Sequence, residues 1–107
     1  MTALIIDVET TGGDANQVIE LAAMTLDGEP VVDQLYKPSC PITCGALAVH
    51  HILPSDLEGK PPSSQVSIPL CDYIIGHNID FDWKAIGSPP VKRMGTQATH
   101  ASTPGDG

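Results

Sequence analysis

The sequence is poor in basic residues. Of its 107 residues only 5 are Lys or Arg, against 13 Asp or Glu, which gives a formal net charge of −8. Proteins that hold nucleic acid by charge alone contact the phosphates with Lys and Arg, so this composition excludes a tight binder of that kind. Bound divalent cations reverse the local charge of a site, and a metal-dependent enzyme is therefore compatible with the acidic composition.

Aromatic residues, paired cysteines and long apolar runs are scarce as well. Aromatic residues make up 4% of the sequence and hydrophobic residues 41%, so the core must be built from Val, Ile, Leu and Ala, which is typical of a single α/β domain. No run approaches the ~20 apolar residues of a membrane span, which indicates a protein without a membrane partner. Three cysteines with no secretory signal before them indicate reduced thiols and a cytoplasmic location.

Three apolar segments near the start predict a meander of strands. Residues 3–6 form a short continuous run that is typical of a strand buried on both faces. Residues 18–26 and 31–36 follow, separated by an Asp27-Gly28 hairpin signal. We therefore expect three antiparallel strands in chain order.

The second half of the sequence predicts two helices and one further buried strand. Residues 43–51 are expected to form a short helix with Thr43 as its N-cap. Residues 73–76 read as a buried strand, and a helix over 79–86 follows it directly.

Two acidic clusters, far apart in the sequence, follow apolar runs. The first is DVETTG at 7–12 and the second is GHNIDFD at 76–82. Side chains alternate across a strand, so Asp7 and Glu9 project to the same side. Carboxylates held in place by buried strands suit hard divalent cations such as Mg²⁺, and the pattern predicts a metal-dependent phosphodiesterase. For an isolated Asp-x-Glu, two solvated surface acids are the simpler interpretation.

Four blocks of sequence resemble the DEDD 3′-to-5′ exonucleases. They are DVETTG at 7–12, VIELA at 18–22, ALAVHHI at 46–52 and GHNIDFD at 76–82. The chain is most similar to the DEDDh branch, which includes the epsilon subunit of bacterial DNA polymerase III, ribonuclease T and exodeoxyribonuclease X. One Asp-x-Glu-Thr would be weak evidence, whereas the pair of acidic blocks with the others between them in register is strong.

The resemblance implies a ribonuclease H-like α/β fold, with a mixed sheet of three antiparallel strands followed by parallel strands and with flanking helices. It also implies hydrolysis by two Mg²⁺ or Mn²⁺ ions, held roughly 4 Å apart so that one activates water and the other stabilises the leaving oxygen. The implied metal ligands and catalytic residues are Asp7, Glu9 and Asp82. The implied substrate is a single-stranded or frayed 3′ end of DNA or RNA, shortened by release of nucleoside monophosphates during replication or repair.

The resemblance further implies six residues that contact the substrate. At Gly12 the missing Cβ permits a close approach. Asn78 has an alternative interpretation as the N-cap of the helix over 79–86, and His50 as a packing residue. Glu20, inside an apolar strand, is expected to support the fold or hydrogen-bond behind the metal ligands. The six implied substrate contacts are Thr10, Thr11, Gly12, His50, Asn78 and Phe81.

The third motif of the DEDDh enzymes is a His followed five residues later by the fourth acidic ligand, on a C-terminal helix. His100 and Asp106 are six residues apart among Thr, Pro and Gly, and do not match it. Residues 94–107 lack apolar periodicity and predict a disordered tail behind a domain of residues 1–93. We expect a truncated exonuclease domain that lacks the C-terminal helix.

An uncovered sheet face of this kind favours a homo-oligomer or a polymerase or repair partner. The alternative to an active enzyme is a catalytically impaired remnant that binds a cation, nucleic acid or a protein through its acidic residues.

Overall fold

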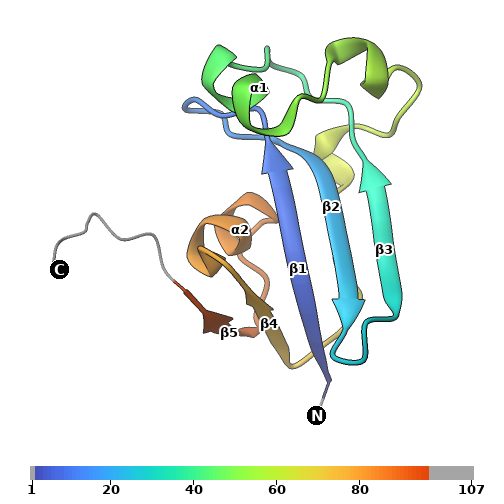
Figure 1. The fold of residues 1–107 in the computed structure, drawn as a ribbon, viewed down its shortest axis with the longest axis vertical. Coiled ribbons are helices and arrows are strands. Elements are labelled where there is room, and N and C mark those ends of the chain that lie inside the picture. Colours follow the sequence, from blue (N-terminus) through green and yellow to red (C-terminus); the bar gives the residue numbers. More distant parts are fainter. Residues whose placement is uncertain (1, 97–107) are drawn as a thin grey trace, which may run out of the picture.

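A five-stranded mixed sheet forms the frame of the protein, of which the computed structural model describes residues 2–96 (Figure 1). The order across the sheet is β3-β2-β1-β4-β5, in which β1, β2 and β3 pair antiparallel while β4 pairs parallel with β1 and β5 parallel with β4. The predicted antiparallel meander followed by parallel strands is therefore confirmed. The strands are β1 (Ala3–Thr10), β2 (Val18–Thr25), β3 (Pro30–Leu35), β4 (Tyr73–Gly76) and β5 (Lys92–Gly95).

β1 is longer than the apolar run that predicted it. It continues through Asp7 and Glu9 to Thr10, because this whole segment pairs with β2. The prediction of a strand buried on both faces is wrong, since Ile5 is only half-buried and Asp7 is exposed. One face of β1 packs on the core, and the other, which we call the open face, carries the carboxylates. The buried side chains of β1 are Leu4, Ile6, Val8 and Thr10.

Two short helices flank the sheet, α1 (Cys44–His50) and α2 (Ile79–Ala85), and 3₁₀ turns lie at 54–57 and 63–65. Thr43 caps α1 as predicted, since its Oγ1 accepts a hydrogen bond from Ala46 N at 3.1 Å. Asn78 occupies the N-cap position of α2 in the left-handed conformation, with φ 54°, but its side chain makes no capping hydrogen bond. Asn78 is therefore the N-cap residue that this interpretation predicted, but without the side-chain hydrogen bond of a cap.

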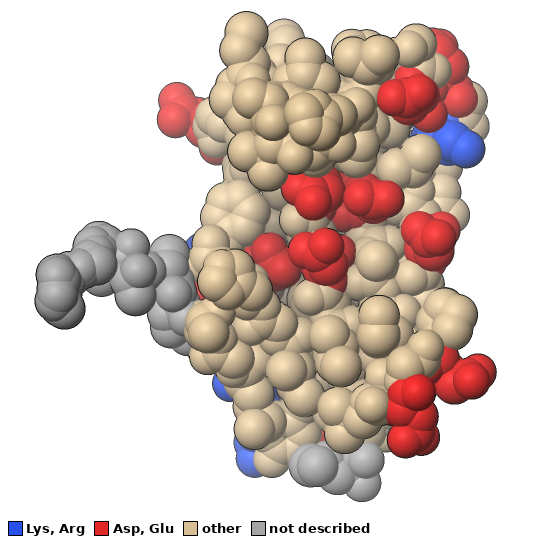
Figure 2. All heavy atoms as spheres, viewed as in Figure 1, with Lys and Arg blue, Asp and Glu red and all other residues tan. Residues whose placement is uncertain are grey.

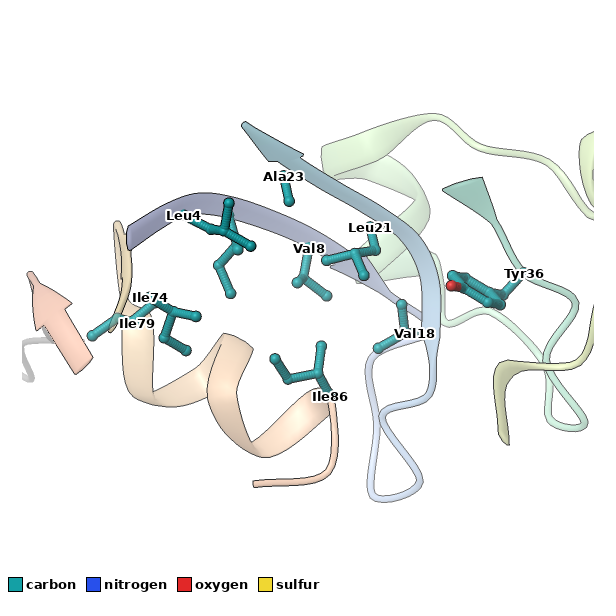
Figure 3. Close-up of a cluster of buried hydrophobic side chains, with 10 residues drawn as sticks. Leu4, Val8, Val18, Leu21, Ala23, Tyr36, Ile74, Ile79 and Ile86 are labelled. Atoms are coloured by element: carbon teal, nitrogen blue, oxygen red, sulfur yellow. The ribbon is translucent and has the colours of Figure 1, made fainter. Parts of the chain in front are cut away.

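The core lies between α2 and the buried face of the sheet (Figure 3). Ile79 and Ile86 project from the ends of α2 toward the strands, as expected for residues seven apart on one helical face. Tyr36 is the single aromatic member of the fully buried cluster, in keeping with the aromatic-poor composition. The cluster consists of Leu4, Ile6, Val8, Val18, Leu21, Ala23, Tyr36, Ile74, Ile79 and Ile86.

The edge strand β5 was not predicted, and it extends two residues beyond the expected domain end at residue 93. Thr96 then ties the chain to the start of α2, since its carbonyl accepts from Ile79 N at 2.9 Å and its Oγ1 from Asn78 N at 3.0 Å. The rest of the predicted tail, with His100 and Asp106, lies outside the described residues. Within residues 2–96 there is no helix with the length and hydrophobicity needed to cross a bilayer.

Candidate metal and catalytic site

Acidic side chains gather on the open face near the middle of the sheet. Figure 2 shows them in red at the centre of one face of the molecule, with Lys and Arg only toward its edges. Strand register explains the gathering, because residues directly opposite each other in neighbouring strands share a face. Glu9 is opposite Glu20, and Asp7 is opposite Ala22, whose neighbour on β3 is Asp33.

Asp82 joins this group from α2. Its side chain is 5% exposed, and its pKa is raised to about 7, first by burial and then by the negative charges of Asp7 and Glu9. A negative charge raises the pKa of a carboxyl group when it lies nearby, so Asp82 lies in the neighbourhood of Asp7 and Glu9. The three predicted metal ligands, separated by more than 70 residues of sequence, are thus brought close together in the fold.

A close approach of the backbone sets the position of Asp82. Gly76 ends β4 against β1, where a Cβ on it would lie 2.9 Å from the carbonyl oxygen of Ile6. β4 pairs with β1 only from Ala3 to Ile5, so the chain turns into α2 beside the part of β1 that carries Asp7. Asp82 follows Ile79 by three residues in α2, and both are buried. A carboxyl group on the buried face of a helix is costly unless a partner compensates it.

The compensating partner is not a basic side chain. The ion pairs found in residues 2–96 are Lys37–Glu58 and Arg93–Asp80, and neither involves the open face. The pKa of Glu9 is also raised, by burial and by Asp7, with His50 acting in the opposite direction. The open face therefore holds negative charge that the described part of the protein leaves unneutralised.

A hard divalent cation suits this donor set, because Mg²⁺ and Mn²⁺ prefer carboxylate oxygens and complete their coordination with water. As the side chains of residues 2–96 are placed, no three His, Cys, Asp or Glu groups converge tightly enough to enclose an ion. Asp7, Glu9 and Asp82 fit an open site, in which water and substrate oxygens supply the remaining ligands.

A cavity of about 270 Å³ lies beside Glu9. Phe81, which is 40% exposed, offers an aromatic face of the kind on which nucleic-acid bases stack. The cavity brings together five of the predicted site residues, namely Glu9, Thr10, Gly12, His50 and Phe81, with Val8, Ala46 and Val49 as apolar walls.

The turn after β1 is built by its own hydroxyl groups. Thr10 Oγ1 donates to Asn16 Oδ1 at 2.7 Å, and the fully buried Thr11 Oγ1 accepts from Gln17 N at 2.9 Å and donates to Gly12 O at 3.1 Å. Thr11 does not line the cavity, and its hydroxyl is engaged in the turn. The structure therefore places the Thr11 side chain in the scaffold behind the predicted substrate contacts.

His50 lines the cavity with both ring nitrogens engaged. Nδ1 accepts a hydrogen bond from Ile52 N at 2.9 Å, and Nε2 lies 3.1 Å from Thr10 O. Nδ1 therefore acts as an acceptor, and Nε2 is the donor to the carbonyl oxygen. His50 therefore braces the turn from α1 and is not a free proton acceptor. Asn78 does not line the cavity.

Glu20, expected to support the fold or to hydrogen-bond behind the metal ligands, lies next to one of the predicted ligands. It faces Glu9 across the β1–β2 pair, and its carboxyl pKa is raised by burial and by Asp33 and Asp7. The signal that would find it is the register of the antiparallel pair, which aligns the two Glu positions only once the loop between the strands is placed.

Asp82 is expected to make the metal-free protein less stable as pH rises. Its pKa is about 7 in the folded protein against an ordinary 3.8, so the folded state binds this proton more tightly than the unfolded state does. The contribution of Asp82 to the free energy of unfolding is therefore complete below about pH 4, falls between about pH 4 and 7, and stays low above. Asp82→Asn should raise the melting temperature at pH 8 by roughly 5 °C and leave it unchanged at pH 4.

Thermal denaturation in EDTA from pH 4 to 8 measures this difference. Asp80→Asn is the matched control, because Asp80 lies on the same helix but is only half-buried and pairs with Arg93 at 2.9 Å. If Asp82→Asn and wild type lose stability in parallel over this range, the assignment of the pH dependence to Asp82 is wrong.

Comparison with known proteins found one family model and a similar solved structure. A family model described as exonuclease, RNase T, matches residues 4–85, which include Asp7, Glu9 and Asp82. A solved structure of exonuclease X in complex with 5′ overhanging duplex DNA is similar, with a TM-score of 0.69 and 30% sequence identity over 85% of this chain. The chain spans 57% of the length of that exonuclease.

Among curated protein sequences, none matches the chain. The family match covers most of the sequence, and the mixed sheet with its two helices is the ribonuclease H-like arrangement expected from the resemblance. This chain belongs to the RNase T family of exonucleases.

Proposed function

We propose that the open face is the active site of a metal-dependent 3′-to-5′ exonuclease, which releases nucleoside monophosphates from the 3′ end of DNA or RNA. The observation that carries the proposal is that Asp7 and Asp82 lie near Glu9, which lines a cavity with an exposed aromatic wall, in a chain of an exonuclease family. The similar exonuclease X is bound to a duplex with a 5′ overhang, which supports a recessed or frayed 3′ end as substrate.

Each residue of the site has a defined task in this proposal. Asp7, Glu9 and Asp82 hold the divalent cations, and when bound these ions supply an activated water and stabilise the leaving oxygen. Phe81 stacks against the terminal base, and Gly12, which lacks a Cβ, lets the backbone of the turn approach the nucleotide. His50 holds the turn in position through the Thr10 carbonyl.

The charge of the site requires the cations for binding as well as for chemistry. Four carboxyl groups lie at the centre of the open face, and no Lys or Arg of residues 2–96 forms an ion pair with any of them. They would repel a phosphodiester. The four are Asp7, Glu9, Glu20 and Asp82. Two divalent cations would offset this charge. The acidic composition therefore points to an enzyme that meets its substrate only when loaded with metal.

Removal of metal is expected to abolish the activity. The purified chain is incubated with single-stranded DNA or RNA oligonucleotides in Mg²⁺, in Mn²⁺ or in EDTA. With metal, a 3′-terminal label should appear in mononucleotides from the first turnover, whereas a 5′-terminal label should stay in progressively shortened strands. EDTA should lower the rate by about 10²-fold or more.

Absence of release in Mn²⁺ at high enzyme concentration would overturn the proposal and favour the non-catalytic acidic remnant. Early release of the 5′-terminal label would leave a nuclease but contradict the 3′-to-5′ polarity.

A further inference from the structure

A second cavity, of about 420 Å³, lies apart from the carboxylates of the open face. It is larger than the cavity beside Glu9 and falls in the size range of small-molecule sites. Its walls come from the loop after β1, the segment after β3, the second 3₁₀ turn and the end of α2. The lining residues are Ala15, Asn16, Gln17, Val18, Lys37, Ser39, Pro62, Ser63, Ser64, Lys84 and Ala85.

The charge of this cavity is opposite to that of the rest of the molecule. None of its lining residues is Asp or Glu, although the chain has a net charge of −8. Two of the five basic residues in the sequence, Lys37 and Lys84, line it together. Serine hydroxyls and side-chain amides make up most of its remaining polar lining. Ammonium groups and neutral hydrogen-bond donors in one concave site suit a phosphate group.

Hydrogen bonds within the protein connect the segments that form the walls of this cavity. Gln17 Nε2 donates to Ser39 Oγ at 2.8 Å, and Ser39 N donates back to Gln17 Oε1 at 2.7 Å. The buried Ser63 donates through Oγ to Val18 O at 2.6 Å and through its backbone N to Lys37 O at 3.0 Å. A site whose walls are already ordered loses little conformational entropy when a ligand binds.

Both lysines are available to an anion. Lys84, in the last turn of α2, takes part in neither of the ion pairs found in residues 2–96. Lys37 lies 3.5 Å from Glu58, but both side chains of this pair are more than half exposed. Exposed pairs of this kind contribute little to stability, so an incoming anion can replace Glu58.

We propose that this cavity is a binding site for a phosphomonoester of nucleotide size, separate from the metal site. Lys37 and Lys84 hold the phosphate, and the polar wall around Gln17 and Ser39 receives the remainder of the ligand. Asn16 links the two sites, because it lines this cavity and also accepts the hydrogen bond from Thr10 Oγ1 that braces the turn beside Glu9.

Calorimetric titration in EDTA tests the site without metal on the open face, so the result is independent of nuclease activity. The probes are inorganic phosphate, adenosine 5′-monophosphate and adenosine. We expect saturable binding of the monophosphate and at least about tenfold weaker binding by Lys84→Ala and by Lys37→Ala. Adenosine should not bind, and inorganic phosphate should bind more weakly than the monophosphate because it leaves the rest of the cavity empty.

Lys92→Ala is the matched control, because it removes the same charge from β5, where Lys92 lies 5.5 Å from the Tyr73 ring and outside this cavity. The dissociation constant of adenosine 5′-monophosphate from Lys92→Ala should stay within about twofold of the wild-type value. The proposal is overturned if the monophosphate does not saturate the protein, if adenosine binds equally well, or if all three lysine variants weaken binding alike. Melting curves of each variant confirm that it is folded.

Discussion

Asp7→Asn is expected to reduce metal-dependent nucleotide release by about 10²- to 10³-fold or more. Asp7 is the central carboxylate of the open face, since its charge raises the pKa of both Glu9 and Asp82. The substitution keeps the size of the side chain and removes the negative charge that a cation needs. The measurement is the initial rate of mononucleotide release from a 3′-labelled oligonucleotide at saturating Mg²⁺.

Asp33→Asn is the matched control for this loss. Asp33 is exposed on the same face, two strands away from Asp7 along the row that passes through Ala22. It makes the same change in net charge and should keep the rate within about twofold. An equal loss in both variants would show that overall charge, rather than a ligand at Asp7, controls the activity. Unfolding cannot explain a loss confined to Asp7→Asn, because removing a repulsive charge should raise the melting temperature in EDTA.

Gly12→Ala is expected to destabilise the protein by roughly 2–3 kcal/mol. Gly12 has φ +69°, a left-handed conformation that costs a residue with a Cβ about 1–2 kcal/mol. The new Cβ would also lie 2.6 Å from Thr43 Oγ1, the group that caps α1. Loss of that cap costs about another 1 kcal/mol and loosens the helix that carries His50. Thermal or urea denaturation measures the change.

Two other glycines separate these causes. Gly28, in the turn between β2 and β3, has φ +88° with no atom within 4 Å of the position that a Cβ would take, so Gly28→Ala should show only the backbone cost of roughly 1 kcal/mol. Gly45 lies inside α1 in open space, and Gly45→Ala should stabilise the protein by roughly 0.5–1 kcal/mol. If Gly12→Ala costs no more than Gly28→Ala, the contact with Thr43 does not contribute.

Much of the sheet was predictable because its signals are local. The Asp27-Gly28 turn and the Thr43 cap each depend on a few neighbouring residues, and the structure confirms them. β5 escaped prediction because Lys92–Gly95 has no apolar alternation and is exposed throughout. This segment becomes a strand through pairing with β4, which is a contact between distant parts of the chain.

The six predicted substrate contacts do not all lie in one place in the structure. Gly12 and Phe81 line the cavity beside Glu9, whereas Thr11 lies buried in the turn and Asn78 lies outside the cavity. A sequence motif lists consecutive residues of one segment, but the side chains of adjacent residues in a strand project to opposite sides. Which member of each motif reaches the site is decided by the turn that follows the strand.

The sequence by itself determined which carboxylates stand on one face of β1, because the period of a strand is a property of the backbone and needs no partner. It also determined the family, because the order and spacing of the motifs can be recognised in the sequence alone. Only the tertiary structure decided that Asp82 lies near enough to Asp7 and Glu9 for their charges to raise its pKa. It also decided that Glu20 lies opposite Glu9. These distances depend on strand register and on the contact of Gly76 with β1, and such long-range packing is set by the whole fold rather than by any one segment.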